Sequence, residues 1–235
     1  MADNETPRNG VDALISRDEG RRYWEGVDAT VNGMLGGFPH VSRVDIRGSR
    51  NFLAKLGIGS KPGQRIAATA LEGGAGIGRV TKGLLLDGVA QQVDVIEPIA
   101  KFTSQLQGKP GVRSIFNMGL EDWQPTEGVQ YDLIWVQWCV GHLTDEQLAQ
   151  FLVRCTSALN PDGGVIVVKE NNSSSGRDEF DNVDSSVTRD DGTFRRIFTE
   201  AGLQLIQTEL QKGLNVAGAS LLPVRMYALK PAQSK

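Results

Sequence analysis

The sequence predicts a doubly wound α/β fold, in which parallel strands alternate with helices. Three observations predict it. Short apolar runs alternate with helical patterns along the chain, a glycine-rich corner follows the first of these runs, and YDLIWVQW is typical of a buried parallel strand. With 235 residues, 40% of them hydrophobic, the chain can bury the core of one large domain.

The stretch Arg65–Leu86, RIAATALEGGAGIGRVTKGLLL, reads as the first strand, a tight turn and a helix. Glycines at 74, 76 and 78 let the backbone turn sharply and let a ligand approach closely. The helix start offers free N–H groups and a positive dipole end, which suit a carboxylate or a phosphate. The corner therefore predicts a small-molecule site.

The spacing of this corner distinguishes among known glycine loops. A dinucleotide fingerprint needs a third glycine where Arg79 stands, and a phosphate-binding Walker loop needs a following Gly-Lys-Ser/Thr. E-x-G-x-G-x-G, beginning at Glu72, is instead similar to the nucleotide-binding signature of S-adenosylmethionine methyltransferases. An arginine at the helix start could pair with the methionyl carboxylate. The alternative is a structural turn without a ligand.

The remaining pattern predicts strands at 91–96, 112–118, 131–138, 165–168, 203–210 and 223–230, and helices at 21–35, 45–56, 80–86, 100–106, 146–159 and 191–201. Residues 1–18 are polar and predict a frayed start. The Gly-rich stretch after the first helix, NGMLGGFPHVS, is either a packed connector or a lid over a pocket. The two last strands suit an antiparallel pair that closes the sheet.

Composition excludes several classes of protein. A net charge of −3 argues against a nucleic-acid binder that relies on a broad basic surface. Cys139 and Cys155 give neither a disulfide framework nor a zinc spacing, so we expect no metal site and a reducing intracellular compartment. No stretch is apolar enough for a membrane span, and the acidic N-terminus is not a secretory signal.

Polar residues recur where the predicted strands end, at the edge where such folds bind ligands. Glu97 follows the second strand at the interval of an acid that bonds ribose hydroxyls, and Leu120 and Glu121 follow the third, where an adenine ring would reach. Trp138 ends the fourth strand, and His142 follows it. Taken singly, each could instead be a solvated acid, a core tryptophan or a surface histidine.

After the fifth strand the pattern dissolves into NSSSGRDEFDNVDSSVTRDDGTF. Its acids Asp181 and Asp184 precede a predicted helix, and a carboxylate-bearing loop at the rim of a cofactor cleft suits a cationic substrate. A disordered acidic insert is the alternative.

Several separated blocks resemble the protein α-N-terminal methyltransferase family: YWEGVDATVNGMLGGF, GGAGIGR, YDLIWVQWCVGHLTD, KEN and DNVDSSVTRD. The resemblance runs from about Tyr23 to Lys230. It implies a seven-stranded Rossmann-like methyltransferase fold whose last strand is antiparallel. Its domain would span 61–235, behind a flexible segment at 1–18 and a helical extension or lid at 19–60.

The resemblance also implies an activity. The family uses S-adenosylmethionine to methylate the free α-amine of proteins that begin X-Pro-Lys after removal of the initiator methionine. Ribosomal and chromatin-associated proteins with that motif would be the partners, in the cytoplasm and the nucleus. Neither direct nucleic-acid binding nor membrane association is implied.

Carried over by position, the family's cofactor contacts correspond to Gly74, Arg79, Glu97, Leu120, Glu121 and Gln137. Its peptide-groove residues correspond to Trp24, Leu35, Trp138, Asn171, Asp181, Asp184 and Ser186, and His142 and Asp184 would manage the amine proton. Glu72 and Glu97 replace more usual aspartates, and Leu222 stands where an aromatic residue is expected. A small-molecule methyltransferase and a non-catalytic binding subunit are the rival interpretations.

Overall fold

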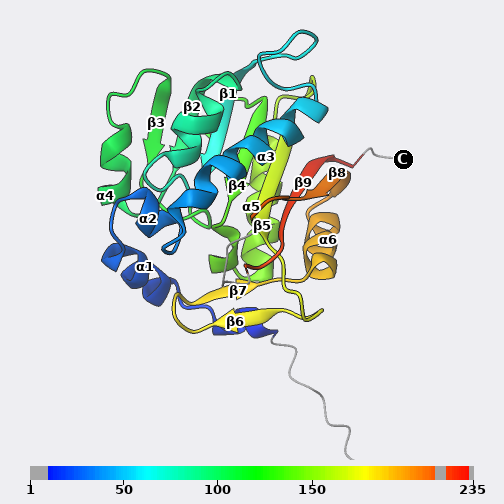
Figure 1. Ribbon diagram of the computed structural model, residues 1–235. Helices are drawn as coiled ribbons and strands as arrows, with labels where there is room; N and C mark the ends of the chain where they lie inside the picture. Colours follow the sequence, from blue (N-terminus) through cyan, green and yellow to red (C-terminus); the bar gives the residue numbers. More distant parts are fainter. Residues whose placement is uncertain (1–9, 215–220, 233–235) are drawn as a thin grey trace, which may run out of the picture.

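A seven-stranded sheet forms the centre of the protein (Figure 1). The computed structural model describes residues 10–214 and 221–232. The strand order is β3-β2-β1-β4-β5-β9-β8. The bounds are β1 (Ala67–Gly73), β2 (Ala90–Ile96), β3 (Val112–Phe116), β4 (Leu133–Gln137), β5 (Val165–Asn171), β8 (Leu203–Leu210) and β9 (Val224–Pro231). The first five strands pair in parallel and β9 runs antiparallel to both neighbours, which confirms the predicted fold class.

Helices cover both faces of the sheet and bury its apolar side chains. On one face α5 (Asp145–Ser157) and α6 (Asp191–Glu200) pack on residues such as Ile134 and Tyr227. On the other, α3 (Ser42–Lys55) and the π-helical turn η3 (Thr81–Leu85) pack on residues such as Trp135. The shorter α4 (Ala100–Thr103) and η4 (Ser104–Leu106) follow β2, and η5 (Val140–His142) follows β4.

Further elements gather beyond one end of the sheet (Figure 1). They are η1 (Val11–Leu14), α1 (Arg17–Gly26), α2 (Val31–Met34), η2 (Pro39–Val41) and the hairpin of β6 (Glu179–Asp181) and β7 (Ser186–Thr188). Because the carboxyl ends of parallel strands meet at one edge, the residues that follow β1, β2 and β4 converge beneath these elements. This edge therefore holds the polar residues singled out from the sequence.

The structure differs from the sequence expectation in the acidic segment after β5 and at the start of the chain. The segment expected to be an irregular loop contains the β6–β7 hairpin, whose strands are only three residues long. Residues 1–9 of the expected flexible start lie outside the described residues, and residues 10–18 form η1 and begin α1. The Asp145 N–H donates to Asp12 Oδ2 (2.9 Å) and the Ser16 N–H to Ser185 Oγ (2.7 Å), and these bonds order that segment.

Within the described parts of the chain, no helix combines the length and the apolar character that crossing a bilayer requires.

The helix expected at 21–35 is interrupted after Gly26, because Val27 has an extended backbone conformation that ends α1. The fold thus places two short helices, rather than one long one, over the edge of the sheet.

Candidate active site

Two adjoining cavities open at the carboxyl edge of the sheet and share one wall. Residues that line both are Trp24, Met34, Trp138, Cys139 and His142. The first cavity is lined by all six residues predicted to bind the cofactor: Gly74, Arg79, Glu97, Leu120, Glu121 and Gln137. The second is lined by every residue predicted to bind the peptide except Asp181, namely Trp24, Leu35, Trp138, Asn171, Asp184 and Ser186. The structure therefore sorts the predicted residues into two groups that meet at a common wall.

The glycine corner lines the first cavity, and its backbone leaves no room for side chains. Gly74 has a φ of +70°, and a Cβ added to it would lie 2.5 Å from Cβ of Cys139. Gly76 has a φ of +54°, and its Cβ would lie 2.8 Å from Sδ of Met34. Only glycine fits both the left-handed backbone and the close approach. A bound nucleotide can therefore approach this backbone directly.

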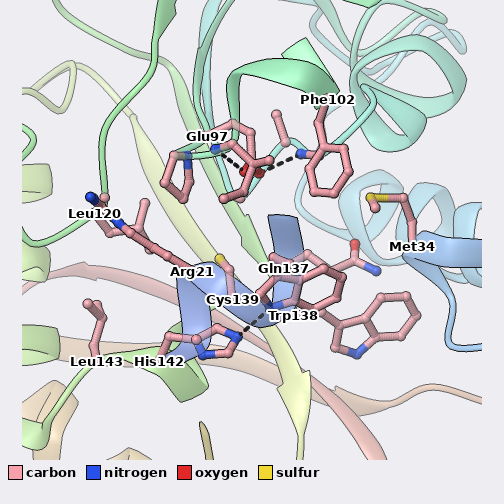
Figure 2. A pocket seen from close by; sticks show the side chains of 18 of the residues that line it. Arg21, Met34, Glu97, Phe102, Leu120, Gln137, Trp138, Cys139, His142 and Leu143 are labelled. Carbon is pink, nitrogen blue, oxygen red and sulfur yellow. Dashed lines mark hydrogen bonds between the residues drawn. The ribbon is translucent and has the colours of Figure 1, made fainter. Parts of the chain in front are cut away.

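Glu97 lies across the cavity from His142 and is fixed by two backbone bonds (Figure 2). The N–H of Gly76 donates to Oε2 and that of Ile99 to Oε1, each at 2.9 Å. Burial raises the pKa of Glu97 above its ordinary value, although these two N–H groups oppose the shift. Each carboxylate oxygen keeps a further lone pair for a hydroxyl donor. The geometry thus fits the ribose of a nucleoside.

Arg79 and Gln137 are held by an acid that the sequence did not reveal. Asp45 of α3 is fully buried and accepts from Arg79 Nη1 at 2.7 Å. It also accepts from Gln137 Nε2 at 3.0 and 3.1 Å. The guanidinium lies over the ring of Trp138, 5.4 Å from its centroid. Arg79 therefore presents a fixed cation to the first cavity, which suits a carboxylate.

The far end of the first cavity is apolar on one side and charged on the other. Leu120 is buried there, and Arg17 of α1 pairs with Glu121 through Nε at 2.9 Å. The same arginine also bonds Asp122, so α1 is tied to the loop after β3. The N-cap residue Ser16 and the α1 residues Gly20 and Arg21 also line the cavity. Sequence reasoning missed all of these, because their cavity contacts depend on where α1 docks.

The second cavity is acidic. Asp184 and Glu170 line it, and no lysine or arginine of the described residues does. Oδ1 of Asp184 is buried and accepts no hydrogen bond from any residue within 10–214 or 221–232. A buried carboxylate oxygen without a donor has strong residual demand for one. This cavity therefore suits a cationic or amine-bearing ligand.

His142 lies on the shared wall, and its ring is held by α1. Its Nε2 accepts from the indole N–H of Trp24 at 2.9 Å, so in the neutral ring the proton resides on Nδ1 (Figure 2). A Cβ on Gly20 would lie 3.2 Å from that Nδ1 and equally close to the backbone oxygen of Asp184. Burial lowers the pKa of His142, although Asp184 opposes the shift. Among the residues that the structure describes, Asp184 rather than His142 therefore has an acceptor atom without a donor.

The turn that carries Trp138 and His142 is held by hydrogen bonds from backbone N–H groups to the side-chain carboxylate of Glu170. Trp138 has a φ of +54°, which is costly for a bulky residue. Glu170 Oε2 accepts from the N–H of Val140 at 3.3 Å, and Oε1 accepts from that of Asn171 at 2.9 Å. Burial raises the pKa of Glu170 to about 7. One carboxylate therefore fixes both the shared wall and a predicted peptide contact.

Asp181 lies outside both cavities. It is exposed, and its Oδ1 accepts from the N–H of Val183 at 2.8 Å. However, it pairs across the hairpin with Ser186, and residues directly opposite in an antiparallel pair share a face. Because Ser186 lines the second cavity, Asp181 stands beside its rim. Leu222, where an aromatic residue was expected, lines this cavity and is 38% exposed.

Glu72, at the start of the glycine corner, should make stability fall as pH rises. Burial raises its pKa to about 8, above the ordinary value of 4.5, so the folded protein retains a proton that the unfolded chain releases. This contribution is present below the unfolded pKa and is lost as pH rises through the folded pKa. We expect Glu72→Gln to abolish this pH dependence. In wild type, Glu72 should lower the free energy of unfolding by up to roughly 1.4 kcal/mol per pH unit between the two pKa values.

Urea denaturation of the cofactor-free protein across that window measures the effect. The free energy of unfolding of wild type, minus that of Glu72→Gln, should decrease with pH and level off above the folded pKa. A difference that stays constant with pH would contradict the assignment of a protonated, buried Glu72.

Comparisons with known proteins agree on the family. The family model described as AdoMet dependent proline di-methyltransferase matches residues 12–230. The chain is 44% identical over 218 residues to "Alpha N-terminal protein methyltransferase 1" of Schizosaccharomyces pombe, covering 90% of this chain and 94% of the relative. It is 44% identical over 199 residues to human "N-terminal Xaa-Pro-Lys N-methyltransferase 1", covering 83% and 87%.

A solved structure extends this likeness to three dimensions. The SAM-dependent methyltransferase from Leishmania major superposes with a TM-score of 0.78 at 39% identity, covering 91% of this chain and 82% of that one. Its fold, the glycine corner and the matched family point to the same cofactor. The chain therefore belongs to the AdoMet-dependent proline di-methyltransferase family, whose cofactor is S-adenosylmethionine.

Proposed function

We propose that this enzyme methylates the free α-amino group of proteins whose exposed N-terminus reads X-Pro-Lys once the initiator methionine has been removed. The human and Schizosaccharomyces relatives carry names that describe such activities. The observation that carries the proposal is the acidic second cavity. It shares a wall with the cofactor cavity, and no lysine or arginine of the described residues lines it.

The charge of this cavity matches the chemistry of an N-terminus. When bound, S-adenosylmethionine supplies a methyl group activated by a cationic sulfur. The protein must hold the amine neutral and in line with the bond between that sulfur and the methyl group, so positioning supplies most of the rate. An α-amine has a pKa of about 7.7–8.0, far below the 10.4 or so of a lysine. The site can therefore deprotonate the first residue while a lysine at the third stays charged.

We assign the residues that meet the cofactor and the peptide as follows. The cofactor is held by Gly74, Arg79, Glu97, Leu120, Glu121 and Gln137, and the peptide by Trp24, Leu35, Trp138, Asn171, Asp181, Asp184 and Ser186. A proline has no N–H, so it can lie on the Trp138 ring without losing a hydrogen bond. Asp184 takes the proton of the α-ammonium, and His142 orients the wall beside it.

Ribosomal and chromatin-associated proteins that begin X-Pro-Lys are the substrates we propose, met in the cytoplasm and the nucleus. The helices of residues 19–60 act as the lid over both cavities in this proposal. This assignment of a lid is supported by Trp24, Met34 and Leu35, which line the cavities from that segment.

The test is a peptide panel incubated with the protein and labelled S-adenosylmethionine. Peptides should differ only in their first three residues, and one control should carry an acetylated N-terminus. We expect label on X-Pro-Lys and none on the acetylated peptide. Equal labelling of both, or labelling of small amines alone, would overturn the proposal.

Arg79→Ala should weaken cofactor binding, because it removes a charge-assisted partner of the methionyl carboxylate. The expected loss is about 1.5–3 kcal/mol. Calorimetric titration with S-adenosylhomocysteine measures it, with a thermal melt to show that the variant is folded. Unchanged affinity in a folded variant would remove Arg79 from the assignment.

A further inference from the structure

A cluster of buried charges lies behind the first cavity, and its two central residues do not line that cavity. Its centre is the pair of Asp45 on α3 and Lys169 on β5, whose side chains have no solvent exposure. Lys169 Nζ lies 2.5 Å from Asp45 Oδ1, while Arg79 Nη1 lies 2.7 Å from Oδ2. One carboxylate is therefore shared by two cations, and only Arg79 reaches the cavity.

Burial lowers the pKa of Lys169 while Asp45 opposes the shift, and the hydrogen bonds around its Nζ fit the ammonium form. Four oxygens surround its Nζ: the Asp45 carboxylate, the Asp45 carbonyl at 3.2 Å, Ser49 Oγ at 2.9 Å and Gln211 Oε1 at 2.8 Å. A neutral amine would offer only two N–H donors to these acceptors, whereas an ammonium offers three. Burial alone would raise the pKa of Asp45, yet Lys169 and Arg79 outweigh it, so that pKa lies below its usual value.

The cluster is consequently charged. Counting one carboxylate against two cations leaves one positive charge, and Gln137 adds no charge of its own. Removing a buried ion from water is costly unless an opposite charge meets it. Without Lys169, Asp45 and Arg79 would form a neutral pair, and any incoming carboxylate would have to compete with Asp45 for the guanidinium.

We propose that Lys169 is a positioning residue for the cofactor: by neutralising Asp45 it leaves the Arg79 guanidinium an uncompensated charge that attracts the carboxylate of S-adenosylmethionine. The inference rests on the assignment of Arg79 in the proposed function. It adds a residue that touches neither cofactor nor substrate and that acts through charge alone.

The test compares two nucleosides that differ in the carboxylate. S-adenosylhomocysteine carries it, whereas 5′-methylthioadenosine keeps the adenosine and the thioether but lacks the amino-acid group. We expect Lys169→Met to weaken S-adenosylhomocysteine about tenfold in calorimetric titration, with 5′-methylthioadenosine changed less than about twofold. The double variant Asp45→Asn/Lys169→Met removes one charge of each sign, so it should regain most of the lost affinity.

Two controls keep the result interpretable. Lys55 is an exposed residue of α3 that pairs with Glu209 of β8, and Lys55→Met should change neither affinity. Lys169→Gln keeps a hydrogen-bond donor without the charge and replaces Lys169→Met should the latter not fold.

The outcomes separate cleanly. Equal loss of both nucleosides, unchanged S-adenosylhomocysteine affinity in a folded Lys169 variant, or a double variant no better than the single one would overturn the proposal. No peptide is present in this experiment, so failure of the X-Pro-Lys assay leaves it unaffected. Failure of Arg79→Ala to weaken S-adenosylhomocysteine would instead identify the Arg79 assignment as the error.

Discussion

Asp184→Asn should lower turnover by roughly 10²–10⁴-fold, the usual contribution of a general base, while cofactor affinity stays near that of wild type. The reason is the buried Oδ1, which accepts no hydrogen bond from the described residues and lines the second cavity. Asparagine keeps the shape but loses the charge that takes up a proton. Single-turnover methylation of an X-Pro-Lys peptide measures the effect, with calorimetry for the cofactor.

Asp181→Asn is the matched control, since it makes the same substitution three residues away on the same hairpin. At saturating peptide it should leave single-turnover rates within a few fold of wild type, because Asp181 lies outside both cavities and would meet the third residue rather than the amine. Near-normal turnover in Asp184→Asn, or an equal loss in both variants, would contradict the assignment and leave solvent as the proton acceptor.

His142 should behave differently from Asp184 in the same assay. Its Nε2 already accepts from the Trp24 indole, so it can take a proton from the amine only after that bond breaks. We therefore assign it to holding α1 against the shared wall. A His142→Ala variant should lose affinity for the peptide as well as turnover, since Trp24 lines both cavities.

The parallel sheet could be predicted because its signals are local. Apolar runs at regular intervals and the glycine corner lie within a few residues of each other, and the order of helices and strands then leaves few topologies. The capping box of α5 is equally local, because the side chains of Thr144 and Gln147 accept from one another's backbone N–H within one helical turn. Element order also brought Glu97 and Gln137 to one edge.

What sequence reasoning missed depends on contacts between distant segments. The sequence indicated Asp45 only as the start of a helix and Lys169 only as part of the KEN block that follows a strand, yet they meet across 124 residues. The β6–β7 hairpin has strands too short for an alternating pattern, and its polar composition is that of a loop. It forms because η1 packs on it and the Ser16 N–H bonds Ser185.

The separation of the two acids of this hairpin predicts how the third residue of the substrate is chosen. Asp184 is half-buried beside His142, whereas Asp181 is exposed on β6 at the cavity rim. A lysine that meets Asp181 stays partly hydrated and keeps its proton, so it does not compete for the base. The enzyme can then use one acid for the cation and another for the amine.

We therefore expect wild type to prefer X-Pro-Lys over X-Pro-Glu by about 100-fold in kcat/KM, with X-Pro-Gln between them, because a glutamate would face both acids. Asp181→Lys should narrow that preference by roughly tenfold or more and could invert it, with methylation of X-Pro-Gln little changed. The measurement is kcat/KM for the three peptides against both proteins, with Asp181→Asn as the charge-neutral control. A wild type that treats the three peptides alike, or an Asp181→Lys variant that keeps the wild-type ratios, would show that recognition of the third residue lies elsewhere in the second cavity.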